Sequence, residues 1–324
     1  MEKIRIGILG CAKVAKEHIV PAILKLHDYY SLVAVASRND EKALQFSSLF
    51  GCEALLGYDT LINRADIDAI YVPLPSGLHK EWINKALMAG KHVYAEKSIA
   101  MKVADAEEMI RNANQNELAL MEGYMFQYHD QHRIVKKLLK EREIGDIRLV
   151  RASFGFPPLA DHSNFRYDAN IGGGALYDVG GYVWRAINYL LGNSFEIKAS
   201  NIYFDGNNTS IYGSAFVCTN DGISGELSFG FDNYYQCNYE IWGSQGKIIC
   251  PKAFTPKENE LTSIIVEKQG CKQILECPPC NHFVKSMEEF YNICIHKEVR
   301  QRHYSDIIYQ IKGLEQMSRL NIRS

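Results

Sequence analysis

The sequence has no apolar run close to the roughly 20 residues that a membrane-spanning helix needs. It also has no excess of either charge, because 36 lysines and arginines nearly balance 38 acidic residues, for a formal net charge of -2. A nearly neutral chain lacks the long-range attraction that draws basic proteins to nucleic acid or anionic membranes. We therefore expect a globular protein whose target is neither nucleic acid nor a membrane.

A disulfide framework is missing as well. The nine cysteines are an odd number, and they are scattered through apparent strands and helices. This pattern is typical of reduced thiols. The first residues, Met1 to Lys3, lead directly into a predicted core strand without the apolar segment of a signal peptide. We therefore expect a cytoplasmic protein.

The length of 324 residues suggests two domains. Up to residue 121, short apolar strands alternate with helical patterns, which predicts a doubly wound α/β domain with a parallel sheet over residues 1–121. The predicted strands are Ile4–Leu9, Leu32–Ala36, Ala69–Val72, His92–Ala95 and Leu118–Met121, and the helices are Val14–Leu26, Asp40–Phe50, Leu78–Ala89 and Val103–Asn114.

Residues 122–324 are predicted to form a second, α+β domain. After Ile147, runs of alternating polar and apolar residues are separated by turn sequences such as Asn220-Asp221-Gly222, which is typical of an antiparallel sheet with one wetter face. The predicted strands are Ile147–Phe154, Glu196–Phe204, Ile211–Cys218, Ile223–Phe231, Tyr235–Trp242 and Thr262–Glu267, and the helices are Leu176–Leu191, Phe283–Ile295 and Ser305–Arg319.

The first predicted strand runs straight into a small-residue turn that opens a helix. Gly10 allows a sharp bend, and Ala12 is small enough to let phosphates approach the backbone. The N–H groups at the start of the helix then point at the anion, so the turn predicts a dinucleotide pyrophosphate site. Ala12 replaces the usual second glycine, and any tight strand-to-helix turn would favour Gly10, so the alternative is a turn without a ligand.

The end of the second strand lacks the acidic residue that usually binds the ribose 2′-hydroxyl of NAD. Ser37-Arg38-Asn39 stands there instead. Arginine pairs well with a 2′-phosphate, and serine adds a hydrogen bond. NADP(H) is therefore the favoured cofactor, and NAD(H), with Arg38 as a solvated loop residue, is the alternative.

Two further strand ends are expected to border the cofactor, since ligands of open α/β sheets bind beyond the carboxyl ends of the strands. The first carries the loop Tyr71–His79, and we favour a packing or capping role for the histidine side chain. The second carries Glu96-Lys97, where the lysine can bind a hydroxyl or carbonyl and favour the ionised form of a neighbouring phenol. A surface Glu-Lys pair is the alternative. The predicted cofactor-binding residues are Gly10, Cys11, Ala12, Lys13, Val14, Ser37, Arg38, Leu74, Pro75, Leu78, His79, Glu96 and Lys97.

The segment from Asn164 to Tyr182 contains three consecutive glycines followed by a helical pattern. Asp178 and Tyr182 are four residues apart and therefore share a face of that helix, with Arg185 near it. A carboxylate beside a phenol is suited to bind a sugar hydroxyl and to pass a proton. The alternative is a glycine-rich helix start with Tyr182 in the core.

Cys277-Pro278-Pro279-Cys280-Asn281-His282 could begin a zinc site or a redox pair. No second ligand cluster with suitable spacing follows. We interpret this segment as structural and expect no metal.

Together these features resemble the Gfo/Idh/MocA oxidoreductases, named for glucose–fructose oxidoreductase and inositol dehydrogenase. The resemblance spans nearly the whole chain. It implies a Rossmann domain joined to a larger, open-faced, mostly antiparallel sheet, which commonly mediates oligomerisation, so we expect a homo-oligomer (dimer or tetramer) through the open sheet face. The matching segments are Gly7–Ala15, Ser37-Arg38, Pro73–His79, Glu96-Lys97, Phe126–His129 and Gly172–Tyr182.

Carried over residue by residue, the resemblance implies three catalytic residues, Lys97, Asp178 and Tyr182. At position 182 the chain has tyrosine, and in this it resembles glucose–fructose oxidoreductase and the nucleotide-sugar 3-ketoreductases. Inositol-dehydrogenase-like members often have histidine there. Ser98 departs from the family, which usually has proline there, so a constraint on the backbone beside Lys97 is lost. The loop Phe156–Asn170, with Asp161 and His162, is expected to select the substrate. The predicted substrate-binding residues are Tyr124, Phe126, Arg166, Tyr167 and Asp178, where Arg166 meets a phosphate or carboxylate or pairs with Asp168.

The implied activity is reversible hydride transfer between the nicotinamide C4 of NADP(H) and a ring carbon of a sugar or nucleotide-sugar. Tyr182 would donate the proton, Lys97 would stabilise the developing alkoxide, and Asp178 would hold a neighbouring hydroxyl. One alternative is an enzyme of the same fold that acts on a non-sugar diol, as dihydrodiol dehydrogenases do. The other is a non-catalytic, cofactor-bound regulatory protein. The presence of both Lys97 and Tyr182 argues against the latter, and Ser98 argues mildly for it.

Overall fold

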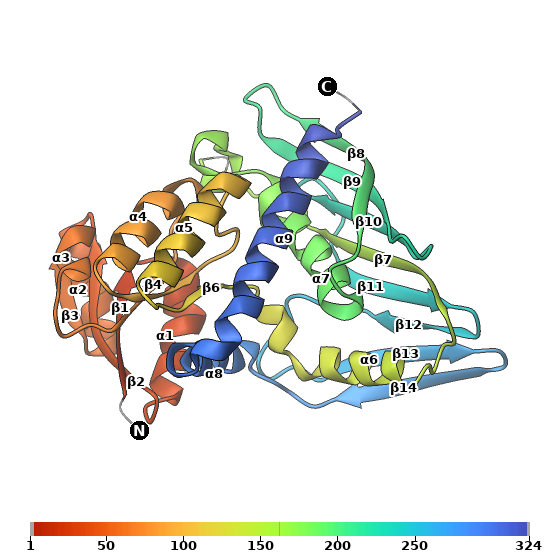
Figure 1. Ribbon diagram of the computed structural model, residues 1–324, viewed down its shortest axis with the longest axis horizontal. Coiled ribbons are helices and arrows are strands. Elements are labelled where there is room, and N and C mark those ends of the chain that lie inside the picture. Colours follow the sequence, from red (N-terminus) through yellow and green to blue (C-terminus); the bar gives the residue numbers. More distant parts are fainter. Residues whose placement is uncertain (1–2, 162, 323–324) are drawn as a thin grey trace. The chain divides into compact units, whose positions relative to one another are not determined.

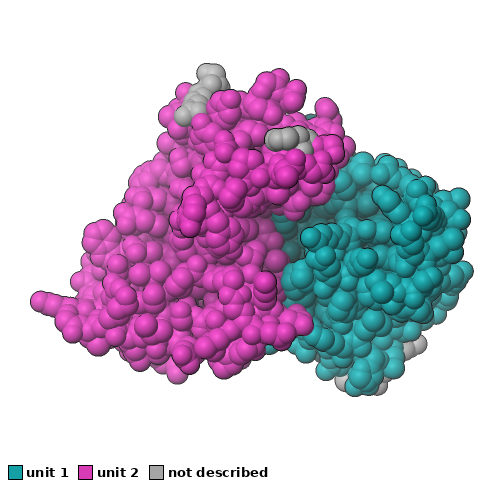
Figure 2. All heavy atoms as spheres, turned by 180° about the vertical axis from the view of Figure 1, so that it is seen from behind, with its two compact units in different colours: residues 1–123, 283–308 teal, residues 124–282, 309–324 magenta. Residues whose placement is uncertain are grey.

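The computed structural model describes residues 3–161 and 163–322 and divides into two compact units (Figures 1 and 2). Unit 1 comprises residues 1–123 and 283–308, and unit 2 comprises residues 124–282 and 309–324. The predicted domains, residues 1–121 and 122–324, are contiguous segments and stay a prediction. In the structure, residues 283–308 cluster with the N-terminal part of the chain. No helix in the described part of the chain has the length and apolar character required to cross a membrane.

Unit 1 is built on a six-stranded parallel sheet in the order β3-β2-β1-β4-β5-β6, which confirms the predicted doubly wound fold. The strand order reverses between β1 and β4, and the crevice at such a switch point is where ligands bind in this architecture. The strands are β1 (Ile4–Leu9), β2 (Tyr30–Ser37), β3 (Glu53–Leu56), β4 (Ala69–Val72), β5 (His92–Ala95) and β6 (Leu120–Glu122).

The helices of unit 1 follow the strands along the chain, and α4 and α5 lie side by side (Figure 1). Local signals fix their ends. In α2, the side chain of Asn39 accepts from the Lys42 amide at 2.9 Å, and Gly51 ends the helix with φ +69°. The helices are η1 (Ala15–Ile19, a π-helical turn), α1 (Val20–Lys25), α2 (Asp40–Phe50), α3 (Tyr58–Ile62), α4 (Ser76–Met88), α5 (Val103–Gln115), α8 (His282–Ile295) and the 3₁₀ turn η6 (Lys297–Val299).

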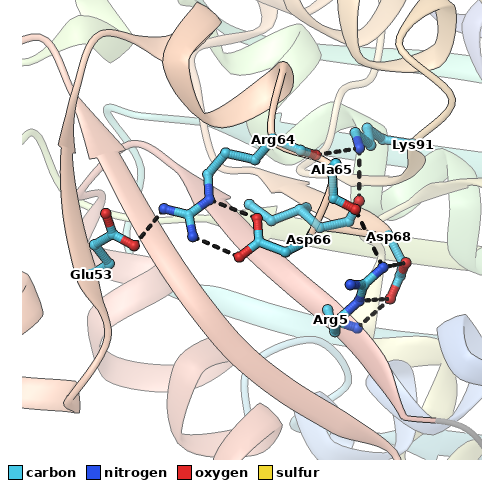
Figure 3. Close-up of polar contacts among 8 residues, drawn as sticks. Arg5, Glu53, Arg64, Ala65, Asp66, Asp68 and Lys91 are labelled. Atoms are coloured by element: carbon cyan, nitrogen blue, oxygen red, sulfur yellow. Dashed lines mark hydrogen bonds and ion pairs between the residues drawn. The ribbon is translucent and has the colours of Figure 1, made fainter.

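The loop before β4 is fixed by a group of ion pairs and hydrogen bonds (Figure 3). Arg5 in β1 binds Asp68 through its Nε at 2.9 Å and its Nη2 at 2.6 Å, and Arg64 binds Asp66 and Glu53. Buried Lys91 donates to the carbonyls of Arg64 and Ile67, both at 2.7 Å. These charges lie at the amino ends of β1 and β4, so they hold the end of the sheet opposite to the ligand crevice.

Helix α8 completes unit 1 although it is distant in sequence. Tyr30 Oη donates to the carbonyl of Met287 at 2.7 Å, and Tyr94 Oη and Ser286 Oγ are 2.8 Å apart. The ring of Phe283 stacks on His18 with centroids 4.4 Å apart. The sheet of unit 1 therefore acquires part of its cover from the C-terminal region.

Unit 2 contains an eight-stranded sheet in the order β14-β13-β12-β11-β7-β10-β9-β8. Every neighbouring pair is antiparallel except β7 and β10, so the sheet is mixed and mostly antiparallel. Helix α7 packs on β7 and β10, and the second half of α9 binds β8. The strands are β7 (Ile147–Gly155), β8 (Glu196–Phe204), β9 (Ser210–Cys218), β10 (Ser224–Gly230), β11 (Gln236–Gly243), β12 (Gly246–Cys250), β13 (Thr262–Lys268) and β14 (Cys271–Cys277).

The core of unit 2 lies between one face of this sheet and the helices. Alternate residues such as Val150, Phe154, Leu227 and Phe229 are buried there, whereas Arg151 and Glu226 point to the other face. The expected wetter face is therefore present. The helical elements are η2 (Met125–Tyr128), α6 (Asp130–Lys140), η3 (Phe165–Tyr167), η4 (Ala169–Ile171), η5 (Leu176–Gly180, a π-helical turn), α7 (Gly181–Leu191) and α9 (Arg300–Arg319, shared by the two units).

Candidate functional site

The turn after β1 has the shape that a dinucleotide requires. Gly10 has φ +118°, and a Cβ there would lie 3.2 Å from Leu74 Cδ2 and 3.7 Å from the Tyr58 hydroxyl. A side chain at this position would therefore press on Leu74 and strain the backbone. Cys11 is half-buried, and its thiol donates to the carbonyl of Lys42 at 3.5 Å. The turn fits a bound pyrophosphate.

The end of β2 carries a positive charge and no carboxylate. Ser37 is buried, and its Oγ accepts from the Asn39 amide at 3.1 Å, so this hydroxyl shapes its own loop. Arg38 is exposed beside the Tyr58 hydroxyl. Burial raises the pKa of Tyr58, and the charge of Arg38 acts in the opposite direction. A guanidinium at this strand end fits a phosphorylated ribose better than a bare one.

Lys97 is the second residue after β5 and is half-buried. Its neighbour Glu96 accepts a hydrogen bond from Tyr71 Oη at 2.7 Å, and the peptide between Lys97 and Ser98 is cis. His79 is fully buried, with Nδ1 3.0 Å from the Ser98 carbonyl and Nε2 2.8 Å from the Leu74 carbonyl. The structure therefore brings the two loops that we expected beside the cofactor into contact through this imidazole.

The three glycines of unit 2 allow a loop to fold back onto the start of a helix. A Cβ on Gly173 would lie 2.5–2.7 Å from the carbonyl oxygens of Phe165, Arg166 and Asp168. Gly174 has φ +117°, and its amide donates to the carbonyl of Arg166 at 2.8 Å. No residue larger than glycine fits this packing without displacing the backbone.

This folding brings Arg166 against the predicted catalytic helix. Its Nε donates to Asp178 Oδ2 at 2.6 Å. The carboxylate raises the pKa of the guanidinium, with smaller effects from the neighbouring phenols of Tyr182 and Tyr167. Of the roles that we considered for Arg166, pairing with Asp168 is not what the structure shows, because the partner is Asp178. A half-buried ion pair therefore lies beside Tyr182.

Tyr182 lies in an aromatic surrounding and is 6% exposed. Its hydroxyl contacts Met125 Sδ at 3.4 Å. The sulfur of methionine is a weak acceptor, so this contact binds the phenolic proton only weakly. The ring packs against Tyr124, Phe126, Phe154 and Phe254, with centroids 5.2–5.8 Å apart.

The other predicted substrate residues have mainly packing contacts. Tyr124 and Phe126 are fully buried, and Tyr124 Oη accepts from Gln310 Nε2 at 3.0 Å. Tyr167 Oη accepts from the Leu159 amide at 2.9 Å. Buried Arg185 donates to Gln127 Oε1 at 3.2 Å. His162, in the loop expected to select the substrate, lies outside the described residues.

Two groups of predicted residues therefore come together, each within its own unit. Unit 1 gathers the Gly10 turn, His79 and Lys97, and unit 2 gathers Asp178 and Tyr182. Sequence reasoning missed Met125, Phe154, Phe254, Gln310 and Ser210 around the second group, and no motif marks them.

The Cys277–His282 segment closes β14 and opens α8, with Cys277, Cys280 and His282 all buried. Over residues 3–161 and 163–322, no group of three or more His, Cys, Asp or Glu side chains is arranged to hold a metal ion.

Comparison with protein families gives two matches along the chain. Residues 4–124 match the GFO/IDH/MocA oxidoreductase family with an NAD-binding Rossmann fold, and residues 132–249 match the GFO/IDH/MocA C-terminal domain.

Three individual proteins are informative. The dTDP-3,4-didehydro-2,6-dideoxy-alpha-D-glucose 3-reductase of Saccharopolyspora spinosa is 41% identical over 89% of this chain and 86% of its own length. The crystal structure of a 3-ketoreductase from Actinomadura kijaniata in complex with NADP and TDP-benzene has a TM-score of 0.95 and 35% identity, and the match covers 99% of this chain and 98% of the other. The trans-1,2-dihydrobenzene-1,2-diol dehydrogenase of Xenopus laevis is 32% identical over 54% of this chain and 53% of its own length.

Proposed function

Since the chain belongs to the GFO/IDH/MocA family of oxidoreductases, we propose that it reduces a ring ketone of a dTDP-linked sugar with NADPH. The observation that supports this most strongly is the match of the whole chain to a 3-ketoreductase whose structure contains NADP and a TDP ligand. The diol dehydrogenase is similar over about half of the chain only, so a non-sugar diol is the weaker candidate substrate.

The cofactor would be held by unit 1. Gly10, Cys11 and the amides up to Val14 would bind the pyrophosphate, and Ser37 with Arg38 would bind the 2′-phosphate. Leu74, Pro75, Leu78 and the Glu96-Lys97 segment would line the remaining part. When bound, NADPH supplies the hydride from its nicotinamide C4.

The proton and the charge would be handled by protein side chains. As the C=O π electrons of the reduced ketone move to oxygen, Tyr182 would transfer its phenolic proton to that oxygen. Lys97 stabilises the negative charge that develops there, and Asp178 accepts from a neighbouring sugar hydroxyl. In support, structures of the Actinomadura kijaniata ketoreductase include variants in which a lysine or a tyrosine is replaced.

The substrate would lie against the Arg166 loop. The guanidinium of Arg166 is half-buried and donates to Asp178 through Nε, so a charged pair lies beside the proposed proton donor. Tyr167 would border the substrate, and buried Tyr124 and Phe126 would support the ring of Tyr182 from behind.

The direct test is to follow NADPH absorbance with a dTDP-linked 3-keto sugar. We expect turnover, and a loss of about 10²–10⁴-fold in Tyr182→Phe and in Lys97→Met. Tyr203→Phe, at an exposed tyrosine, is the matched control. If both site variants kept wild-type turnover, the assignment would be wrong. If the protein turned over only a trans-diol, the proposed substrate class would change from a dTDP-linked sugar to a non-sugar diol.

We further propose a homodimer or tetramer formed through the open face of the unit 2 sheet. Exposed Phe216, Trp242 and Ile274 lie among strands that also carry a row of alternating charges. Such a row is complementary to a second copy of itself. The ion pairs of this row are Arg151–Glu226, Arg151–Glu240, Lys247–Glu240, Lys247–Glu267 and Lys272–Glu267, at 2.7–3.7 Å.

Sedimentation of the full chain tests this surface. We expect an oligomer that Trp242→Glu weakens, and no effect of Leu49→Glu, an exposed leucine in unit 1. A monomeric wild-type protein at micromolar concentration would refute the proposal.

We also propose the cytoplasm as its location, since none of the nine cysteines, all of which the structure describes, forms a disulfide. Alkylation of the nine thiols in gently lysed cells, read by mass spectrometry, tests this, and oxidised pairs would contradict it.

A further inference from the structure

The backbone that presents Lys97 is held on both sides by buried or half-buried side chains. Before the lysine, Glu96 Oε1 accepts from Tyr71 Oη of β4 at 2.7 Å. After it, the Ile99 amide donates to Glu122 Oε1 of β6 at 2.9 Å. Lys97 itself lies outside regular secondary structure, so these side-chain contacts, and not a strand or helix, fix its position.

His79 supplies the contact nearest to the lysine. Its Nδ1 is 3.0 Å from the carbonyl of Ser98, one residue after Lys97, and its Nε2 is 2.8 Å from the carbonyl of Leu74. The ring is fully buried, and both nitrogens face protein carbonyls. Its ring nitrogens therefore serve the two loops and not a cofactor.

The imidazole is also suited to lie beside a cation. The pKa of His79 is lowered to about 4, chiefly by burial and to a lesser extent by the charge of Lys97, although the carbonyls act in the opposite direction. At neutral pH the ring is therefore uncharged. It donates a single hydrogen without repelling the ammonium of Lys97.

We infer that His79 is a positioning residue for Lys97: its single N–H, on Nδ1, donates to the Ser98 carbonyl, while the Nε2 side of the ring packs against the Leu74 loop. The inference rests on the proposed function, in which Lys97 stabilises the developing alkoxide. A displacement of about 1 Å in such a group lowers the rate by about 100-fold.

Two substitutions separate the two contacts of the ring. The amide nitrogen of asparagine lies near the place of Nδ1, so His79→Asn keeps a donor for Ser98. The amide nitrogen of glutamine lies near the place of Nε2, so His79→Gln places its donor at the Leu74 carbonyl and not at the Ser98 carbonyl. We expect His79→Gln to lower kcat by about 10- to 100-fold, and His79→Asn to keep most of kcat but raise KM for NADPH. Equal kcat losses in the two variants would overturn the inference.

The Lys97→Met background shows whether His79 acts through the lysine. We expect His79→Gln to add little to the kcat loss of Lys97→Met. If Lys97→Met lowers kcat and His79→Gln causes its full loss of kcat on top of that, the positioning role of His79 is refuted, but the role of Lys97 is not. A wild-type kcat in Lys97→Met would instead refute the proposed role of Lys97.

A milder variant covers the case in which the His79 variants do not fold. Tyr71→Phe removes only the hydroxyl that binds Glu96, and its kcat loss should likewise vanish in the Lys97→Met background. A fully additive loss would overturn the inference by this route as well. His27→Gln, at an exposed histidine of the same unit, is the control and should leave kcat and KM unchanged.

Discussion

Acid should destabilise this protein well above the range in which its carboxylates titrate, and buried His132 shows why. The Ala253 carbonyl, 3.0 Å from Nε2, only accepts, so Nε2 carries the hydrogen and Nδ1 accepts from Tyr239 Oη at 2.9 Å. Burial lowers the pKa of His132 to about 3 from an ordinary value of 6.5. Burial likewise lowers the pKa of His79 and of half-buried His92 to about 4.

The sign follows from which state binds the proton. Below pH 6.5 the unfolded chain takes up protons at these histidines, whereas the folded protein does so only near pH 3 to 4, so stability falls as the pH falls. Each pH unit below 6.5 costs about 1.4 kcal/mol per group, which gives about 2 kcal/mol at pH 5. His79 and His132 together then remove about 4 kcal/mol, and His92 at most about 2 more. This is a large share of the roughly 5–15 kcal/mol that stabilises a typical fold.

Urea unfolding followed by tryptophan fluorescence at several pH values measures this loss. His132→Gln keeps a donor for Ala253 but cannot take up a proton. Its free energy of unfolding should therefore fall about 2 kcal/mol less than that of the wild type between about pH 7 and about pH 5. His27→Gln, at an exposed side chain, should follow the wild-type curve. Parallel curves for wild type and His132→Gln would refute the argument that buried histidines cause the acid sensitivity.

Three other predictions test the site and its support. Gly173→Ala places a Cβ 2.5–2.7 Å from three carbonyl oxygens, so thermal unfolding should show a destabilisation of about 1–3 kcal/mol, and an unchanged Tm would contradict the packing. Arg38→Ala should raise the Kd of NADPH by about 10- to 100-fold and leave the Kd of NADH nearly unchanged. Fluorescence titration measures both constants, with Arg111→Ala, at an exposed arginine, as the control. An equal loss of affinity for both cofactors would contradict a contact with the 2′-phosphate. Arg166→Lys should restore part of the kcat that Arg166→Met loses, because the ion pair with Asp178 re-forms, and identical rates in the two variants would exclude a role for that charge.

The sequence predicted most of the sheet in unit 1 because its central strands consist almost entirely of apolar residues. β1, β4 and β5 have the bounds that their hydrophobic pattern indicates. β3, Glu53–Leu56, was missed because it is a short edge strand whose residues are only half-buried or exposed. In unit 2, the edge strand β14 was missed because it is mostly exposed and lacks clear alternation. Helix α6 was missed as well, although its apolar residues are suitably spaced.

The candidate site shows where sequence reasoning ends. The glycine-rich segment and Asp178 were found from the local pattern, but the partner of Arg166 was not, because the glycines fold the loop back over a span that no periodicity describes. The parallel pairing of β7 with β10 depends equally on long-range packing. The π-helical turn that carries Asp178 is likewise invisible in a pattern of apolar residues.

Residues 283–308, which pack on the sheet of unit 1, matter for the design of any truncated or chimeric form of this protein. A fragment that stops at residue 123 would leave Tyr30 and Tyr94 without the hydroxyl and carbonyl partners that α8 provides, and the ring of Phe290 would no longer pack on Tyr94. A chimera that exchanges the nucleotide-binding half for that of a relative must therefore transplant residues 283–308 along with it.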